Sequence, residues 1–429
     1  MEQPLALLKR RSSEAWLIGY DCETLVKLAE QRYQDLLKLD SPSMILSDRN
    51  PVSFIASFIA ACSVPCHIFL CNPDWSESEQ QQAIDLAKLP AIANPMIMIP
   101  TGGTSGKIRF VMHTWETLTA SVEGFQRYFE CAHVNSFCVL PLYHVSGLMQ
   151  LMRSLLSDGK LIIKPWKDLN TCQIDPSEFF LSLVPTQLQR LMHRADWLAQ
   201  FKTILLGGAP AWDELLDQAR SHQIPLAPTY GMTETASQIA TLKPIDFLRG
   251  QTGCGQVLPH ANLSIHPETQ KISIQAKSLM LGYYPMLSNA TSYEPDDLGF
   301  LDDRGFLHIL GRDSDKIITG GENVFPSEVE AAIRATHLVE DVCVIGLPDR
   351  TWGEVVTAIY VPKNGTQDEL ILALSPLLTK FKQPKRWIAI AELPRNAQGK
   401  LRRDRILGIA TNPTSYRRFA ETSLENLPT

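Results

Sequence analysis

The sequence lacks the long apolar segments and the excess of one charge that mark several specialised classes of protein. Its longest apolar runs, such as residues 54–62, are too short and too interrupted to span a bilayer. The basic cluster at residues 9–11 is not followed by an apolar segment of the signal-peptide type. Lys and Arg number 40 against 46 Asp and Glu, and the net charge of −6 gives no electrostatic reason to expect nucleic-acid binding. We therefore expect a cytoplasmic protein with no integral membrane segment and no nucleic-acid partner.

Cysteine is present, but not in the arrangements that form disulfide frameworks or zinc sites. The nine cysteines are odd in number, and none belongs to a Cys-x-x-Cys pair. A metal site could be suggested by Cys62, Cys66, His67 and Cys71, but their spacing fits no common zinc site and apolar residues separate them. The pattern favours reduced cysteines in the protein core.

The length of 429 residues exceeds that of a typical single domain, and the order of the apolar runs predicts how the chain is divided. Over the first two-thirds, short runs of strand character alternate with amphipathic stretches, which is typical of α/β layers with a largely parallel sheet. These runs are residues 43–46, 66–70, 137–140, 160–163 and 203–206. From about residue 253, short strands with tight turns predict a small β-rich subdomain.

The last part of the chain has the pattern of a separate compact domain. A proline, a hydroxyl and an early acid at residues 326–328 are typical of a helix start. Strands are predicted at residues 342–346 and 355–361. We expect an α/β protein with a large domain over residues 1–311 and a small, mobile α+β domain over residues 312–429.

A glycine-rich loop at residues 100–107, Pro-Thr-Gly-Gly-Thr-Ser-Gly-Lys, follows the apolar run 96–99. Glycines let the backbone approach a ligand closely, and hydroxyl and amide groups present donors to an anion. The spacing differs from that of a Walker loop, and Ile108 stands where a hydroxyl residue would bind magnesium. A phosphate cradle is the natural interpretation, although polar glycine loops also occur as ordinary turns.

Four further motifs follow the loop in a fixed order. They are Thr-Tyr-Gly-Met-Thr-Glu-Thr at 229–235, Asp-Leu-Gly at 297–299, Gly-Arg-Asp at 311–313 and Arg-Asn-Ala-Gln-Gly-Lys at 395–400. The set resembles the adenylate-forming superfamily of acyl-CoA synthetases, peptide-synthetase adenylation domains and luciferases, over nearly the whole chain. The resemblance implies an enzyme that activates a carboxylic acid and uses ATP, Mg²⁺ and coenzyme A.

The resemblance also implies roles for the residues that contact ATP. The loop holds the β- and γ-phosphates, Thr233 contacts the α-phosphate, and Glu234 helps to bind Mg²⁺. Asp297 and Arg312 contact the ribose, and Tyr230 frames the adenine. The positions implied in ATP or AMP binding are Thr101, Gly102, Gly103, Thr104, Ser105, Gly106, Arg109, Gly208, Ala209, Tyr230, Gly231, Asp297 and Arg312.

Lys400 matches the catalytic lysine of the superfamily. Its ammonium group would stabilise the charge that develops at the α-phosphorus during adenylation. Taken alone, a lysine in this basic stretch would be interpreted as a solvated surface residue. With the other motifs present, Lys400, Thr233 and Glu234 are the predicted catalytic residues.

Positions after Arg312 are implied in the second step, thioester formation with CoA. Ser314 matches the hinge of the superfamily, where many members carry Asp or Lys, and Gly320, Gly321 and Glu322 would line the tunnel for the pantetheine arm. The candidates for contacts with the CoA phosphates are Lys380, Lys382, Lys385 and Arg386, with a solvated helix face as the alternative.

Two further departures from the superfamily pattern affect the nucleotide site. Arg109 follows Ile108 where relatives usually have Pro and Lys, and arginine keeps the charge while adding a fork of donors. Residues 295–297 read Pro-Asp-Asp in place of the usual Thr-Gly-Asp, which keeps the carboxylate and changes the turn before it.

Within the superfamily, residues 141–148, 230–239 and 320–324 most resemble the 2-succinylbenzoate–CoA ligases of menaquinone and phylloquinone biosynthesis, in which serine at the hinge is less unusual. This dicarboxylate has an aromatic ring and a ketone, so its pocket needs polar donors beside an aromatic slot. The candidate donors are His144, Gly207, Ser237 and Gln238.

Three alternatives remain open from the sequence. The chain could act on another aryl or acyl acid, or pass the acyl group to a carrier protein. It could also be a non-catalytic nucleotide-binding relative, but retention of Glu234, Asp297, Arg312 and Lys400 argues against that interpretation.

An isolated histidine such as His144 is also often structural. The sequence does not indicate an oligomeric state.

Overall fold

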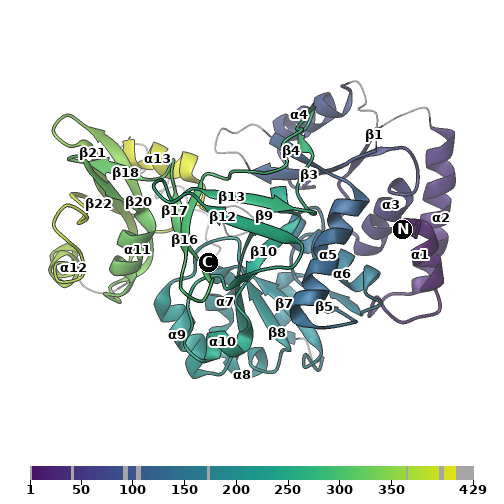
Figure 1. Cartoon of the computed structure of the whole chain (residues 1–429), viewed down its shortest axis with the longest axis horizontal. Helices are drawn as coiled ribbons and strands as arrows, with labels where there is room; N and C mark the ends of the chain where they lie inside the picture. Colours follow the sequence, from purple (N-terminus) through teal and green to yellow (C-terminus); the bar gives the residue numbers. More distant parts are fainter. Residues whose placement is uncertain are drawn as a thin grey trace, which may run out of the picture.

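The computed structural model describes residues 2–39, 43–89, 95–102, 108–171, 174–363, 366–395 and 401–411. A larger body contains two sheets with helices around them (Figure 1). A smaller lobe lies at one end of the long axis and contains the elements that follow β17 (Leu307–Arg312).

The first sheet has the strand order β1-β2-β3-β4-β14-β15. The first three strands run parallel, and the other three are added antiparallel. The strands are β1 (Ser43–Leu46), β2 (His67–Leu70), β3 (Ile97–Gly102), β4 (Ile108–His113), β14 (Gly282–Tyr283) and β15 (Met286–Leu287). The helices of this part are α1 (Pro4–Arg10), α2 (Cys22–Lys38), α3 (Pro51–Ala61), α4 (Glu77–Ala87) and α5 (Trp115–Phe129).

The glycine-rich loop joins β3 to β4, which pair as antiparallel neighbours with Thr101 opposite Arg109. A Walker loop joins a strand to a helix, so the antiparallel connection agrees with the departure from Walker spacing. After β4 the chain turns directly into α5, because the Thr114 side chain accepts a hydrogen bond from Thr117 N and caps the helix. Strand β4 therefore links the glycine-rich loop to the interior of the body.

The second sheet has the order β11-β10-β9-β8-β7-β5-β6, with parallel pairing from β6 to β9 and antiparallel pairing from β9 to β11. The strands are β5 (Asn135–Cys138), β6 (Leu161–Ile163), β7 (Phe179–Leu183), β8 (Thr203–Leu206), β9 (Leu226–Met232), β10 (Ser237–Thr241) and β11 (Gln256–Val257). The helical segments are α6 (Val145–Leu156), η1 (Trp166–Thr171), α7 (Pro185–Leu191), η2 (Met192–Arg194), α8 (Ala195–Leu198), α9 (Asp213–Ser221), η3 (Thr233–Thr235) and α10 (Pro244–Leu248).

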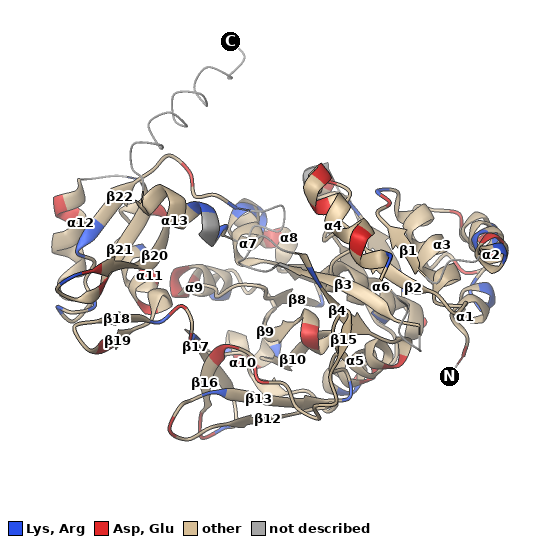
Figure 2. Cartoon of the chain, turned by 90° about the horizontal axis from the view of Figure 1, so that it is seen from above, with Lys and Arg blue, Asp and Glu red and all other residues tan. Residues whose placement is uncertain are grey.

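Two antiparallel pairs follow, and Figures 1 and 2 place the second of them between the larger body and the smaller lobe. The pairs are β12 (Ala261–Ile265) with β13 (Ile272–Ala276), and β16 (Asp297–Leu301) with β17. The lobe contains β18 (Ile317–Thr319), β19 (Glu322–Val324), α11 (Pro326–Arg334), β20 (Val339–Asp349), β21 (Gly353–Pro362), α12 (Gln367–Leu374), β22 (Arg386–Ala389) and α13 (Arg403–Thr411). Its sheet has its own apolar core between β20, β21 and α11.

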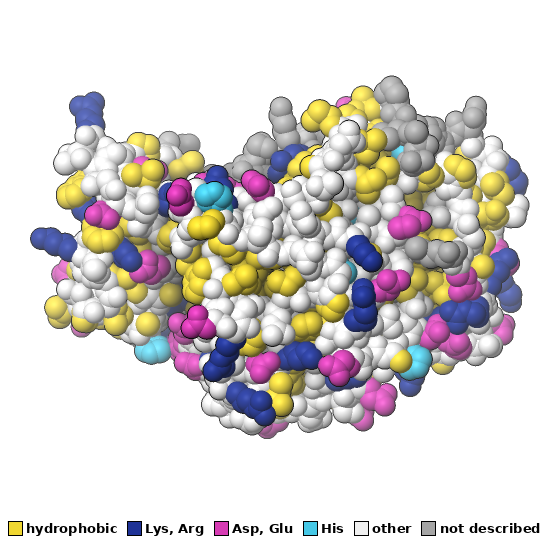
Figure 3. Space-filling view, in the orientation of Figure 1, with side chains coloured by type: hydrophobic (Ala, Val, Ile, Leu, Met, Phe, Trp, Pro, Cys, Tyr) yellow, Lys and Arg dark blue, Asp and Glu magenta, His cyan; other side chains and the backbone are white. Residues whose placement is uncertain are grey.

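The predicted α/β architecture is confirmed, with a larger N-terminal part and a smaller α+β lobe. One strand is displaced: the expected strand at 137–140 is β5 at Asn135–Cys138. Its polar start is buried, since Ser136 is 1% exposed and pairs with β6 and β7. Within the described ranges, no helix combines the length and apolar character needed to cross a bilayer. On the face in Figure 3, basic and acidic side chains are intermixed.

Candidate active site

The turn between β9 and β10 is held at every one of its four consecutive carbonyl groups. The carbonyls of residues 233–236 accept, in order, from His113 Nε2 (2.7 Å), Met280 N (2.8 Å), Ser278 Oγ (2.9 Å) and Ser121 Oγ (2.7 Å). Burial lowers the pKa of His113 to about 4, so the imidazole is neutral at pH 7 and its Nε2–H donates. The turn that carries Thr233 and Glu234 is therefore fixed before any ligand binds.

Glu234 projects from this turn and is 7% exposed. Tyr283 Oη donates to Glu234 Oε1 at 2.7 Å and lies 3.1 Å from Tyr293 Oη. The Arg109 guanidinium lies over the Tyr283 ring, 4.8 Å from its centroid. Burial, with the hydrogen bond to Glu234, raises the pKa of Tyr283, so the phenol keeps the proton that it donates.

A single carboxylate suits the magnesium ion that accompanies ATP. Within the described residues, no group of three or more His, Cys, Asp or Glu side chains is arranged to hold a metal ion. Magnesium at nucleotide sites takes one or two carboxylates, and water and the phosphates supply its other ligands. Glu234, nearly buried and ordered by Tyr283, fits that requirement.

Tyr230 and Asp297 meet from strands β9 and β16. Tyr230 Oη donates to Asp297 Oδ2 at 2.8 Å, and Arg312 Nε lies 3.4 Å from Asp297 Oδ1. Burial and the Asp297 charge raise the pKa of Tyr230, which keeps this phenol a donor. Burial raises the pKa of Tyr293, and the charges of Glu234 and Asp297 act in the same direction.

The turn after β8 brings a bare backbone close to β9. A Cβ atom at Gly207 would lie 2.5 Å from Thr229 Oγ1, and Gly208 has φ +82°, a left-handed conformation that glycine adopts without strain. Gly207, Gly208 and Ala209 therefore present backbone groups beside Tyr230, which follows Thr229 on the neighbouring strand.

A buried arginine that the motifs did not indicate joins Ser237 and Gln238. Arg153 on α6 is 3% exposed, and its Nη2 donates to Ser237 Oγ (2.9 Å) and Gln238 Oε1 (2.7 Å). Its guanidinium lies 4.4 Å from the centroid of the Phe125 ring. Burial lowers the pKa of Arg153 to about 9, which leaves it charged at pH 7.

Arg153 is hydrogen-bonded, but its positive charge has no acidic partner among the described residues. Among the described residues, no carboxylate forms an ion pair with Arg153, and its buried Nε has no hydrogen-bond partner. The buried Gln238 Nε2 is also without a partner there. An uncompensated buried charge with adjacent free donors is suited to an anionic ligand.

Comparisons with known proteins show the family of the chain. Residues 26–284 match the model of the AMP-binding enzyme family, and residues 328–400 match that of the AMP-binding enzyme C-terminal domain. The chain belongs to the AMP-binding enzyme family.

Within this family, the chain is similar to 2-succinylbenzoate–CoA ligases. The protein of that name from Listeria monocytogenes is 33% identical over 353 residues, which are 79% of this chain and 73% of that protein. The one from Oceanobacillus iheyensis is 31% identical over 435 residues, or 92% of this chain and 87% of that protein. The fold resembles that of the o-succinylbenzoate CoA synthetase MenE from Bacillus subtilis in complex with the acyl-adenylate intermediate OSB-AMP. That structure has a TM-score of 0.81 at 24% identity, over 94% of this chain and 98% of that chain.

We call the segment around Ser314, the predicted hinge, the joint; it is exposed and hydrogen-bonded to the larger body. The Asp296 carboxylate accepts from Ser314 N at 3.2 Å and also from Ser314 Oγ. Asp313 N donates to Asp296 O at 2.8 Å, and Lys271 Nζ lies 3.4 Å from Asp313 Oδ2. The two family models leave residues 285–327 between them, so the boundary at 311/312 stays a prediction.

The predicted CoA residues form a tight turn between β18 and β19. Gly320 and Gly321 have φ +61° and +88°, which favour glycine at this turn. Gly320 N donates to Trp352 O at 2.8 Å, and Lys385 Nζ lies 4.2 Å from the Trp352 ring centroid. Trp352 is 41% exposed and Glu322 is exposed, so this side is open to solvent.

Some predicted residues lie elsewhere or outside the described ranges. Lys400 and loop residues Gly103, Thr104, Ser105 and Gly106 are outside them, whereas Thr101 and Gly102 end β3. His144 is the N-cap residue of α6, half-buried, with its ring 4.7 Å from that of Tyr143. It lies nine residues before Arg153 on the same helical segment, and its role at the site stays a prediction.

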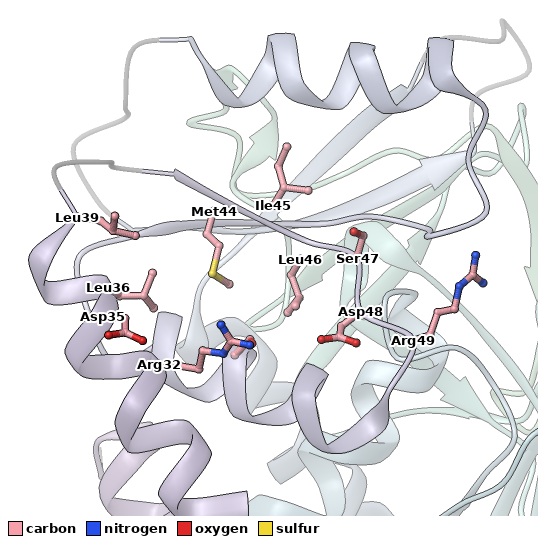
Figure 4. A pocket seen from close by; sticks show the side chains of 11 residues that line it. Arg32, Asp35, Leu36, Leu39, Met44, Ile45, Leu46, Ser47, Asp48 and Arg49 are labelled. Carbon is pink, nitrogen blue, oxygen red and sulfur yellow. The ribbon is translucent and has the colours of Figure 1, made fainter.

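A surface pocket of about 610 Å³ lies between α2 and β1, away from the predicted site residues (Figure 4). Arg32 and Asp35 from α2 line it, with Asp48 and Arg49 beyond the end of β1. Both signs of charge are present, which does not match a polyanion such as ATP. We assign no function to this pocket.

Proposed function

We propose that the chain is an ATP-dependent acid–CoA ligase that acts on 2-succinylbenzoate in the cytoplasm, as a step of quinone biosynthesis. The carboxylate displaces diphosphate from ATP to form an acyl-adenylate, and the CoA thiol then displaces AMP to form the thioester. Family membership and the curated relatives of that name support the reaction. The observation that carries the choice of acid is the buried Arg153, which forms no ion pair with a carboxylate of the described residues.

The Tyr230–Asp297–Arg312 cluster is suited to the ribose and adenine of ATP. Asp297 has the two acceptor oxygens that a pair of ribose hydroxyls requires, and Arg312 is half-exposed beside it. Tyr230 holds the carboxylate in place and offers its ring as one wall of the adenine pocket. Gly207, Gly208 and Ala209 would provide the backbone edge of that pocket.

The turn with Thr233 and Glu234 is suited to the phosphates and their magnesium ion. Glu234 would provide the carboxylate ligand, Thr233 would contact the α-phosphate, and the loop from Thr101 to Gly106 would enclose the β- and γ-phosphates. Bound Mg²⁺ supplies positive charge that neutralises the phosphates. Because the turn is fixed in advance, little reorganisation is needed when ATP binds.

Arg153 is suited to the carboxylate of 2-succinylbenzoate that does not react. A dicarboxylate must bury one anionic group away from the reaction, and a buried cation with free donors beside it compensates that cost. Arg153 Nε and the amide nitrogen of Gln238 have no partner among the described residues, and Ser237 is in the same cluster. A monocarboxylic substrate would leave this charge uncompensated.

The small lobe is suited to the CoA step. Gly320, Gly321 and Glu322 would border the pantetheine arm, and the exposed face of Trp352 lies next to them. Lys385, which lies over the Trp352 ring, is a candidate for a CoA phosphate. Lys400 would act earlier, at the α-phosphorus, and the joint near Ser314 would turn the lobe between the two steps.

Pyrophosphate release with four acids tests the proposal. The acids are 2-succinylbenzoate, benzoate and two matched monoacids, 4-oxo-4-phenylbutanoate and 2-butanoylbenzoate, each of which keeps one carboxylate. We expect the highest kcat/KM with the dicarboxylate. One of the two monoacids lacks the carboxylate that is adenylated and should not turn over. The other lacks only the carboxylate that Arg153 anchors, and its kcat/KM should be about 30-fold lower than that of the dicarboxylate. Equal or better turnover of benzoate would contradict the choice of acid.

A further inference from the structure

Strand β4 reaches the turn that carries Glu234 by two separate routes. At its end, His113 donates to the Thr233 carbonyl at 2.7 Å. At its start, Arg109 lies over the Tyr283 ring, and Tyr283 donates to the Glu234 carboxylate at 2.7 Å. The first route fixes the backbone of the turn, and the second acts on its side chain.

The contact between Arg109 and Tyr283 follows from the register of the sheet. Tyr283 on β14 pairs with Val111 on β4. Side chains two residues apart on a strand share a face, so Arg109 lies diagonally across from Tyr283. A planar guanidinium stacks on an aromatic face, whereas an ammonium group does not provide the same flat contact. The departure from the usual lysine therefore changes what this position does.

Tyr283 binds only one of the two oxygens of the Glu234 carboxylate. The hydrogen bond ends on Oε1, and within the described part of the chain none reaches Oε2. Tyr293 Oη lies 3.1 Å from Tyr283 Oη and adds a second restraint on the phenol. The Glu234 carbonyl is bound to Met280 N, so the backbone and the side chain are both restrained.

We propose that Tyr283 is a positioning residue that orients Glu234 for Mg²⁺, and that Arg109 acts through Tyr283 by fixing its ring. The inference rests on the proposed function, because Glu234 is taken to bind the metal that accompanies ATP. Groups that orient a metal ligand typically change metal affinity by about 10- to 100-fold when they are removed. Tyr283 is given no contact with the reacting atoms.

Tyr283→Phe is the direct test, because it removes only the hydroxyl group. Tyr284→Phe is a matched control: Tyr284 is the next residue, 7% exposed, and its buried Oη has no partner among the described residues. Calorimetric titration with ATP over a series of Mg²⁺ concentrations gives the apparent affinity for the metal. AMP binding without added metal gives a second readout.

We expect Tyr283→Phe to raise the Mg²⁺ concentration at half-saturation about 10-fold or more. Binding of AMP without metal should stay within about twofold, and Tyr284→Phe should change neither quantity by more than that. An unchanged Mg²⁺ dependence in Tyr283→Phe would overturn the proposal. An equal loss of AMP binding would also overturn it, because a general disturbance of the site would then explain the effect.

Arg109 variants give an independent check if Tyr283→Phe does not fold. Arg109→Met should shift the Mg²⁺ dependence in the same direction, and adding Arg109→Met to Tyr283→Phe should give little further shift. Fully additive shifts would contradict an action through Tyr283. If the unmodified protein binds no ATP at any Mg²⁺ concentration, the proposed function fails. A Mg²⁺-dependent wild type with an unaffected Tyr283→Phe removes only this inference.

Discussion

Two regions differ in how far they are assembled before any ligand binds. One is the part of the larger body that holds the Glu234 and Tyr230 clusters, and the other is the joint that leads to the small lobe. In the body, Glu234 and Tyr230 are 7% and 9% exposed, and each makes a hydrogen bond to another cluster residue. At the joint, Ser314 is exposed, and in the β18–β19 turn of the lobe a Cβ atom at Gly321 would meet nothing within 4 Å. We therefore expect the first step to use a preorganised site and the second to need parts that are free to move.

Lys400→Ala should give the largest effect. It tests whether a residue from beyond the joint takes part in the first step. Lys400 follows the joint in sequence, yet we expect it to act in the first step. Removing one group that stabilises the transition-state charge costs about 10²- to 10³-fold in kcat. Pyrophosphate release should fall by that amount, with little change in ATP affinity. Lys363→Ala, an exposed lysine of the same lobe, is the control, and unimpaired adenylation in Lys400→Ala would remove this lysine from the site.

Arg153→Met tests whether the unpaired charge in the body serves the substrate. Losing one partner of a buried ion pair costs about 2 kcal/mol or more, so KM for 2-succinylbenzoate should rise about 30-fold. The monoacid that lacks the anchored carboxylate should show almost no difference between the variant and the wild type. A similar loss for both acids would contradict the anchoring role.

Arg11→Met is the matched control, because Arg11 is equally buried but fully partnered. It is 1% exposed and donates to Glu14 (2.7 Å), Ser154 O (2.8 Å) and Gly159 O (2.9 Å). Its loss should lower the free energy of unfolding by about 3 kcal/mol and leave KM unchanged. Arg153→Met should keep most of its stability, since it removes an uncompensated charge.

The buried His113 should make the preassembled turn sensitive to acid. Its pKa is lowered to about 4 in the folded protein, against about 6.5 when unfolded. The unfolded chain therefore binds the proton first, and stability falls as the pH drops from 6.5 towards 4. Between pH 6.5 and pH 5, His113 should account for about 2 kcal/mol of that fall. Denaturant unfolding of His113→Gln should show a correspondingly flatter pH dependence, and exposed His222→Gln should not; equal slopes would contradict this assignment.

Asp296→Gly, which restores the usual residue, should give the smallest effect and act only on the second step. The bonds from Asp296 to Ser314 are exposed, so they contribute about 0.7 kcal/mol, or threefold in rate. Single-turnover CoA transfer should become about threefold faster, and adenylation should not change. Asp303→Asn, an exposed acid in the turn at the other end of the β16–β17 pair, is the charge control. A slower adenylation in Asp296→Gly would show that the joint belongs to the first step.

The sequence predicted the elements of the fold more reliably than their contacts. Apolar runs located β1 and β8 at their observed bounds, whereas β5 was displaced because Asn135 and Ser136 are polar residues in a buried strand. The helix start at Pro326 was correct. The pattern of apolar residues depends only on the type of each residue. A polar residue whose hydrogen bonds are made inside a sheet is therefore interpreted as part of a loop.

For the candidate site, too, the sequence predicted residues more reliably than their contacts. The motifs indicated Tyr230, Glu234 and Asp297, but the pairing of Tyr230 with Asp297 joins residues 67 positions apart and follows from no local pattern. Arg153 and Tyr283 were missed because their roles depend on burial and distant partners. One signal was present: Arg153 is the only charged residue of helix α6.

The most direct test of the account follows both products in one reaction by mass spectrometry. With ATP, Mg²⁺ and 2-succinylbenzoate but no CoA, the protein should form diphosphate and an enzyme-bound 2-succinylbenzoyl-adenylate. Addition of CoA should convert that adenylate to 2-succinylbenzoyl-CoA and release AMP in equal amount. If no adenylate forms, or if the adenylate forms and CoA does not discharge it, the assignment as a 2-succinylbenzoate–CoA ligase is contradicted.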